Sequence, residues 1–203
     1  NHPGSFTSPA WANGVFQKTA AVFDGSSSLV DVGASSEFDA LSAVTLEAWV
    51  NVTGSWSGSP HIINKGVGGY QRFMLFINSD GKPEFAVKTE LSPSITPYWP
   101  IQKNRWVHIA GVYDGNNMWL YVDGVEQAYR ANVGWAPDRG QPIYIGRTPY
   151  WSNTGLIGML QGVRISNIAR HSFPYARIDA LPGLVLGAQI DKPTPGSARL
   201  VVT

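Results

Sequence analysis

The stretch that decides the fold runs from Asn104 to Gly124 and reads NRWVHIAGVYDGNNMWLYVDG. Residues 106–113 (WVHIAGVY) alternate between two faces, which is the period of a β-strand. Residues 118–122 (MWLYV) do the same after DGNN, whose residues adopt left-handed backbone conformations easily. Both strands are apolar at nearly every position, more than a half-solvated strand carries. We therefore predict a β-hairpin deep in a sheet that is covered on both faces.

The rest of the composition is that of one all-β domain. Only 14% of the 203 residues are charged, against about a quarter in typical soluble domains. The 22 glycines, 14 prolines and 12% aromatic residues indicate many turns, short strands and large packed side chains. Strand-like segments recur at short intervals with no sustained helical period, which predicts a sandwich rather than an alternating βα fold.

Charge and cysteine content exclude several function classes. The net charge is +1 and the basic residues are scattered singly, so we expect no nucleic-acid partner. No apolar run approaches the roughly 18 residues of a membrane span, so we expect no membrane insertion. The absence of cysteine excludes disulfides, thiolate zinc sites and cysteine nucleophiles. The chain starts at Asn1 without a signal-peptide pattern, so we expect a processed product or a piece of a longer chain.

The expected organisation is one domain with two extensions. We assign residues 1–19 to an N-terminal extension or edge strand and residues 20–183 to the domain. Residues 184–203 form a C-terminal extension or linker that ends in the β-prone tail RLVVT. Within the domain, residues 35–41 are expected to form one helical turn, and residues 127–141 a long loop.

Six segments occur in an order and spacing that resemble a known family: AVFDGSSSLVDVG, VTLEAWVNV, HIINKG, the central hairpin, IYIGR and GMLQGVRISNIAR. The series resembles the laminin-G-like domains, which are concanavalin A-like and pentraxin-related, over roughly residues 20–172. The most specific part is W-x-H-x-A…Y-D-G…Y-V-D-G, followed by I-G-R and V-R-I. The resemblance implies an all-β fold, a two-sheet antiparallel jelly-roll sandwich, which would cover the hairpin.

Catalysis is not expected. Glycanases of the resembled superfamily carry an E-x-D-x-E strand, because acid and nucleophile must face one sugar ring about 5 Å apart. None of the 14 acidic residues belongs to such a triplet, and neither G-x-S-x-G nor H-E-x-x-H occurs. We interpret His108 as a structural core histidine. Glu47 is interpreted as a framework carboxylate, paired with an arginine such as Arg164.

Calcium is the one candidate cofactor, in a structural role. Many relatives hold Ca²⁺ with a carboxylate from a G-x-I-D-E-V-R-I segment, and here GMLQGVRI places Gln161 where the Asp would stand. An amide oxygen can bind Ca²⁺ but brings no charge, so the affinity should fall. Asp24 in the FDG turn is the second candidate ligand, with capping of its own turn as the alternative role.

Aromatic side chains in Gly-, Pro- or Ser-rich loops are the main functional signal, because indole and phenol rings pair well with the apolar faces of sugars. Neighbouring polar groups could bind the hydroxyls. The candidate ligand-binding residues are Trp56, Tyr70, Arg72, Tyr98, Trp99, Trp135, Arg139, Arg147, Tyr150 and Trp151. At least half of these aromatics should instead anchor loops against the sandwich. We expect Trp56, Trp99, Trp135 and Trp151 to be the exposed ones.

The sequence therefore predicts a non-catalytic, lectin-like module of a larger secreted or cell-surface protein, with a glycan or polysaccharide as partner. The alternative is a structural or adhesive subunit that binds other protein subunits. In that case the β-prone tail would add to the sheet edge of a neighbour.

Overall fold

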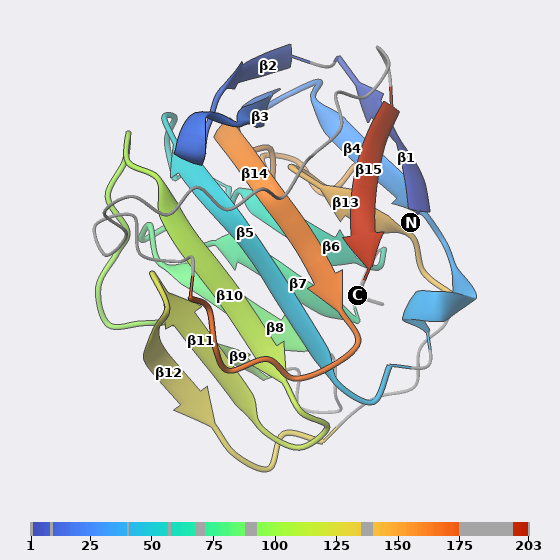
Figure 1. Ribbon diagram of the computed structural model, residues 1–203, viewed down its shortest axis with the longest axis vertical. Helices are drawn as coiled ribbons and strands as arrows, with labels where there is room; N and C mark the ends of the chain where they lie inside the picture. Colours follow the sequence, from blue (N-terminus) through green and yellow to red (C-terminus); the bar gives the residue numbers. More distant parts are fainter. Residues whose placement is uncertain are drawn as a thin grey trace.

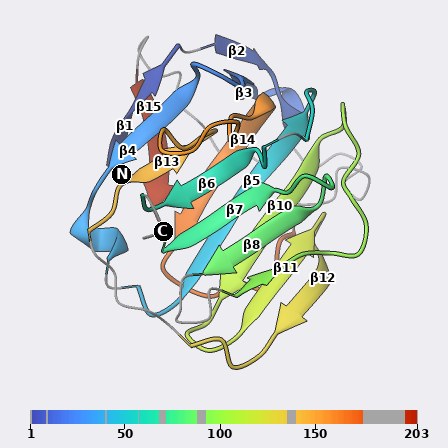
Figure 2. The same ribbon diagram turned by 180° about the vertical axis from the view of Figure 1, so that it is seen from behind.

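The computed structural model describes residues 2–8, 10–39, 41–56, 58–67, 72–87, 93–134, 140–174 and 197–202. These residues form two antiparallel β-sheets of seven strands each, packed face to face. Figure 1 views the sandwich from one sheet and Figure 2 from the other. The predicted all-β jelly roll is confirmed.

The sheet in front in Figure 1, here called the β5 sheet, contains the central hairpin. Its order is β2 (Ala10–Asn13), β3 (Thr19–Asp24), β14 (Ile157–Ser166), β5 (Val44–Val52), β10 (Val107–Tyr113), β11 (Met118–Val122) and β12 (Val125–Arg130). The second sheet, in front in Figure 2, is the β6 sheet. Its order is β1 (His2–Thr7), β4 (Leu29–Gly33), β13 (Ile143–Ile145), β6 (His61–Lys65), β7 (Phe73–Ile77), β8 (Pro83–Val87) and β9 (Ser94–Ile95).

The centre of the β5 sheet is buried on both faces, as predicted for the hairpin. Every residue of β5 and of β10 is buried, and the two strands pair from Val107 opposite Val50 to Tyr113 opposite Val44. Residues that face the β6 sheet fill the core between the sheets. Gly111 on β10 allows the closest approach, because a Cβ there would collide with the ring of Phe85 on β8.

The loop predicted over residues 127–141 is wrong in its first part, where β12 covers Val125–Arg130. This strand pairs only with β11 among the described residues, and most of its positions are exposed. An edge strand without a buried face needs no apolar alternation, so the sequence carried no strand signal there. The helical turn expected within residues 35–41 is the short 3₁₀ helix η2 (Ser36–Phe38).

Both terminal segments take part in the sheets. Strand β1 pairs with β4, and β2 pairs with β3. The β-prone tail forms β15 (Ser197–Val202), which pairs antiparallel with β1 and parallel with β14 and thereby links the two sheets. Figure 1 shows β15 between these two strands. In the structure the tail completes its own domain.

Candidate functional site

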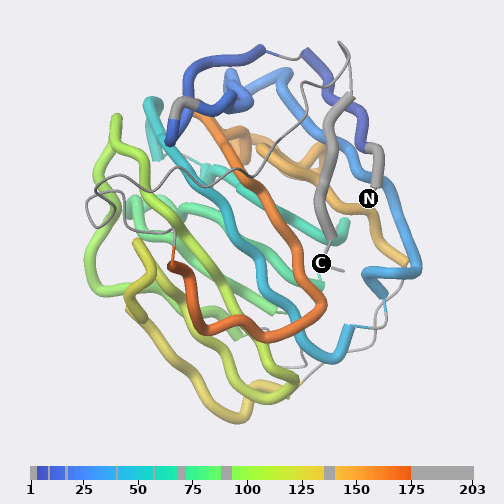
Figure 3. The backbone as a smooth tube through the Cα atoms, viewed as in Figure 1, coloured from blue at the N-terminus to red at the C-terminus, as the bar shows by residue number. Residues whose placement is uncertain are grey.

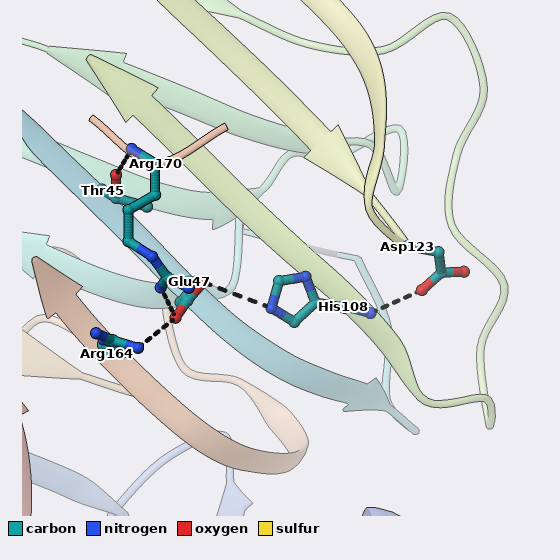
Figure 4. Close-up of polar contacts among 6 residues, drawn as sticks. All are labelled: Thr45, Glu47, His108, Asp123, Arg164 and Arg170. Carbon is teal, nitrogen blue, oxygen red and sulfur yellow. Dashed lines mark hydrogen bonds and ion pairs between the residues drawn. The ribbon is translucent and has the colours of Figure 1, made fainter. Parts of the chain in front are cut away.

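A polar cluster lies on the outer face of the β5 sheet, centred on Glu47 (Figure 4). Arg170 Nη1 lies 2.5 Å from Glu47 Oε1, and Arg164 Nη1 lies 3.7 Å from the same oxygen. His108 Nε2 lies 3.9 Å from Glu47 Oε2. The predicted Arg164 partner is therefore present, but Arg170 is closer. Sequence reasoning missed Arg170 because it follows β14 and reaches Glu47 only after the chain turns back.

The segment that carries Arg170, residues 167–174, crosses the outer face of the β5 sheet (Figure 3); we call it the covering segment. Thr45 on β5 donates its hydroxyl to Ile168 O at 2.7 Å and accepts the Arg170 N–H at 2.9 Å. The Phe173 ring packs against Tyr121, with centroids 5.1 Å apart. This segment supplies the cover that the apolar outer face of the hairpin requires.

His108 is enclosed under this segment. Its ring lies 5.4 Å from that of Trp49 and 5.5 Å from that of Phe173, measured between centroids. Burial, together with the nearby Arg170 charge, lowers the pKa of His108 to about 4. The imidazole is therefore neutral near pH 7. These contacts favour the structural role predicted for His108 over a catalytic one.

Another part of the outer face of the β5 sheet is contacted by the short 3₁₀ helix η1 (Val15–Gln17), which is bonded to Gln161 on β14. The Val15 N–H donates to Gln161 Oε1 at 2.6 Å, and Gln161 Nε2 donates to Val15 O at 3.2 Å. The Phe16 ring packs edge-on against Trp49 at 5.8 Å. Both polar atoms of the Gln161 side chain thus bind the backbone of this segment.

The predicted calcium ligands, Asp24 and Gln161, do not fit one ion. The Asp24 carboxylate accepts the N–H groups of residues 26–28 at 2.8–2.9 Å and the Ser27 hydroxyl, which hold its pKa well below its usual range. Asp24 on β3 pairs with Ile157 on β14. A strand rises about 3.3 Å per residue, so Gln161 lies roughly 13 Å further along β14 than the partner of Asp24. In the described part of the chain, no three His, Asp or Glu side chains are grouped to hold a metal. Asp24 caps its turn and Gln161 holds η1.

Of the ten predicted ligand-binding residues, three lie outside the described part of the chain and a fourth is buried. Tyr70, Trp135 and Arg139 lie outside the described residues. Arg72 is only 4% exposed, and its Nη2 donates to Leu41 O at 3.3 Å. Its guanidinium is therefore used inside the protein, away from the exposed surface at which we expected a glycan to bind.

Trp56 was expected to be exposed but is half-buried. Its ring lies over Gly81 in the β7–β8 turn, where a Cβ would come within 2.7 Å of Trp56 Cε2. The Lys103 ammonium also lies 4.8 Å from the centroid of this ring. These contacts take up ring surface, so Trp56 anchors its loop to the β7–β8 turn.

Tyr98 and Trp99 form an exposed pair that we call the aromatic corner. They are 76% and 73% exposed, and their rings meet at 87° with centroids 4.6 Å apart. Pro97 and Pro100 flank the pair and restrict its backbone. Ile101 is buried behind it, and its N–H donates to Gly81 O at 3.0 Å. The corner is therefore held out in solvent by a fixed loop.

Tyr150 and Trp151, on the loop between β13 and β14, are less free. Tyr150 is 52% exposed, with its hydroxyl 3.4 Å from that of Tyr144. Trp151 is 37% exposed and packs edge-on against His61 at 5.6 Å. The Arg147 guanidinium on the same loop donates to Ser26 O. These side chains partly anchor their loop and partly face solvent.

Contacts between loops place the aromatic corner and the Tyr150–Trp151 pair at the same end of the sandwich. The loop of Trp56 touches the β7–β8 turn at Gly81, and its Gly58 packs against Asn153 in the loop after β13. At the start of β6, the His61 N–H donates to Thr154 O at 2.9 Å. The loop of Tyr98 and Trp99 joins through its bond to Gly81. Arg72 lies near the opposite end, beside Leu41, which precedes β5.

These features define an all-β jelly-roll domain with a closed outer sheet face and with aromatic side chains exposed on loops at one end. The chain belongs to the concanavalin A-like lectin/glucanases superfamily, whose family model matches residues 7–172. No curated protein matches the chain.

Solved structures with the same fold include binding domains. Domain 4 of AbnA, an extracellular arabinanase from Geobacillus stearothermophilus in complex with arabinotriose, has a TM-score of 0.62 and 18% identity, over 78% of this chain and 74% of that chain. The binding domain of Paraclostridial Mosquitocidal Protein 1 has a TM-score of 0.68 and 16% identity, over 83% and 44%. A heptameric pentraxin from Limulus polyphemus has a TM-score of 0.52 and 17% identity, over 64% and 66%. The matched region spans less than two thirds of the length of the mosquitocidal-protein and pentraxin chains.

The described residues contain only short 3₁₀ helices, η1 and η2. Among them, no helix is long and apolar enough to cross a bilayer.

Proposed function

We propose that the chain is a non-catalytic carbohydrate-binding domain of an extracellular protein, and that it binds a glycan at the aromatic corner. The observation that carries this proposal is the exposure of Tyr98 and Trp99, at 76% and 73%. Two adjacent large rings in solvent lack the stabilisation that burial would give them. A sugar ring laid on the exposed surface of one of these rings would recover part of that stabilisation, because its apolar C–H groups meet the aromatic surface.

The rigidity of the corner supports binding. The flanking prolines and the anchored Ile101 fix the loop before a ligand arrives, so less conformational entropy is lost on association. The perpendicular arrangement of the rings allows a sugar stacked on one ring to touch the edge of the other. The arabinotriose complex of the AbnA domain supports a carbohydrate as the ligand class.

The closed outer face supports a binding role without catalysis. The contacts of Glu47 in the described chain are to Arg164, Arg170 and His108, not to a second carboxylate at the spacing that glycoside hydrolysis needs. The covering segment bonds to Thr45 and places Arg170 on Glu47, whose side chain is only 10% exposed, so a polysaccharide has little access to this carboxylate. The alternative of strand donation to another subunit is not favoured, because β15 pairs within its own chain.

The test is glycan-array screening of the full chain, followed by calorimetric titration with the strongest glycan. We expect Tyr98→Ala and Trp99→Ala each to weaken binding about tenfold, since a stacked ring contributes on the order of 1 kcal/mol beyond its buried area. Tyr129→Ala is the matched control, because Tyr129 is also exposed, at 53%, but lies on the edge strand β12. Unchanged affinity in both folded corner variants would overturn the proposal, as would an array without any bound glycan.

A further inference from the structure

We infer that the glycan bound at the aromatic corner carries a negatively charged group, a carboxylate or a sulfate; this inference rests on the proposed function. It is drawn from two lysines beside the corner, Lys82 and Lys103. Lys82 follows Gly81 in the β7–β8 turn, and its Nζ lies 5.8 Å from the centroid of the Tyr98 ring. Lys103 is on the loop of the corner itself, with its Nζ 4.8 Å from the centroid of the Trp56 ring.

Neither lysine is neutralised by a carboxylate of the described chain. The ion pairs there join Lys65 to Asp39, Arg105 to Asp123, and Glu47 to its own cluster. Glu84, the acidic residue on β8, accepts a hydrogen bond from Asn78 Nδ2 at 3.2 Å. Asp80, exposed in the same turn as Lys82, carries a carboxylate that would oppose an anionic ligand.

An ammonium group beside an aromatic ring keeps its charge, and its N–H groups that point away from the ring can donate to a ligand. A neutral sugar offers these donors only hydroxyl oxygens. A carboxylate or sulfate offers charge-assisted hydrogen bonds, which are shorter and about twice as strong. Because the Lys82 ammonium lies 5.8 Å from the Tyr98 ring, a sugar stacked on the corner brings its substituents close to this charge.

Arg147, at the same end of the sandwich, is a weaker candidate for this contact, because its guanidinium already donates to Ser26 O. Of the basic residues that the structure describes, the two lysines are therefore the ones we assign to this contact. The negative charge of Asp80 would repel an anionic ligand. Removal of this charge should therefore strengthen the binding of an anion.

The experiment measures binding of the full chain to pairs of glycans that differ in charge. The probes are oligogalacturonides and their methyl esters, sialyllactose and lactose, and heparin and desulfated heparin, on an array that also holds neutral arabino- and xylo-oligosaccharides. We expect the charged member to bind more tightly in at least one pair. This preference should shrink as salt rises from 50 to 500 mM, because exposed charges are screened within about 10 Å at 0.1 M.

Charge variants then assign the effect to the site. Lys82→Gln and Lys103→Gln should each weaken binding of the charged glycan about twofold to fivefold, and the double variant more, in keeping with exposed ion pairs. Asp80→Asn should strengthen it by a similar factor. Arg130→Gln is the matched control, because Arg130 is exposed on β12 beside Met118, away from the corner. Circular dichroism and melting temperature verify that each variant is folded.

The outcomes separate the two proposals. Equal or tighter binding of the neutral members, or lysine variants that bind like the wild type, would overturn the anionic ligand and leave the proposed function standing. An array without any bound glycan would overturn both. Loss of binding in the lysine variants, together with a gain in Asp80→Asn and no change in Arg130→Gln, would establish the inference.

Discussion

Two buried histidines, His61 and His108, couple the stability of this domain to pH. Burial lowers the pKa of His61 from 6.5 to about 4, and burial with the Arg170 charge does the same for His108. The folded state therefore binds fewer protons than the unfolded state between these two values, and it becomes less stable as the pH falls through this window.

We predict that the free energy of unfolding is nearly independent of these groups above pH 7 and falls from pH 6.5 to pH 4. Each histidine contributes a loss of roughly 3 kcal/mol, at about 1.4 kcal/mol per unit of pKa difference. Urea denaturation at a series of pH values measures this slope. His61→Gln and His108→Gln should each remove about half of it. An undiminished slope in both single variants would contradict the assignment.

At the same scale, the aromatic side chains illustrate how one residue type takes two roles. Trp56 and Trp99 both follow turn-forming residues in the sequence, yet Trp56 packs on Gly81 and Trp99 is 73% exposed. The difference depends on a glycine in another turn, which leaves room for one indole. No local pattern distinguishes the two tryptophans.

The covering segment is an element without regular secondary structure that seals the outer face of the β5 sheet. Its central contact is the Arg170 guanidinium on the Glu47 carboxylate, whose side chains are 22% and 10% exposed. Removing one partner of such a largely buried pair leaves the other charge without its closest partner, and that costs more than the pair contributes.

We predict that Arg170→Ala lowers the free energy of unfolding by about 1–3 kcal/mol, with Arg164 keeping part of the compensation of Glu47. The pKa of His108 should rise in this variant, because the Arg170 charge is one cause of its lowering. Urea denaturation and NMR titration of the His108 ring measure the two effects. Arg130→Ala, an exposed arginine on β12, should change neither.

The packing of β10 against β8 depends on the missing side chain at Gly111. We predict that Gly111→Ala destabilises the fold by about 1–3 kcal/mol through overpacking against Phe85. Phe85→Leu should relieve part of this cost, so the double variant is less destabilised than the sum of the single changes. Thermal and urea unfolding of all four proteins test this. Simple additivity would contradict the contact.

For the whole molecule, β15 closes the seam between the two sheets. We predict that a chain ending at Gly183, which lies outside the described residues, stays monomeric like the full chain but melts about 2–6 °C lower. It loses the pairing of β15 with β1 and β14. Light scattering measures size and calorimetry measures the melting temperature. A full-length oligomer that becomes monomeric on truncation would support strand exchange instead.

Calcium binding is also tested on the whole molecule. We predict that millimolar Ca²⁺ leaves the melting temperature unchanged, because Asp24 caps its turn and Gln161 holds η1. A ligand at 100 times its dissociation constant would add about 2.7 kcal/mol of stability. A rise of several degrees, absent with Mg²⁺, would show that other groups form a calcium site.

The sequence by itself determined the fold class and the central strands. Alternating apolar residues in the stretch 104–124, with turn residues between, specify a hairpin whose faces must both be covered, since side-chain direction in a strand follows from local geometry. The order of the turn and strand motifs was enough to indicate the family. The structural interpretation of Glu47, with Arg164 as a partner, also came from the residues alone.

Only the tertiary structure decided which aromatics are exposed, what covers the outer face, and where the tail pairs. Burial of Trp56, the contact of Arg170 with Glu47, and the place of β15 between β1 and β14 all join segments far apart in the sequence. Such contacts depend on the summed packing of many residues rather than on a local period. The aromatic corner became a candidate site only when the fold had placed Trp56 against Gly81 and left Tyr98 and Trp99 the most exposed of the described loop aromatics.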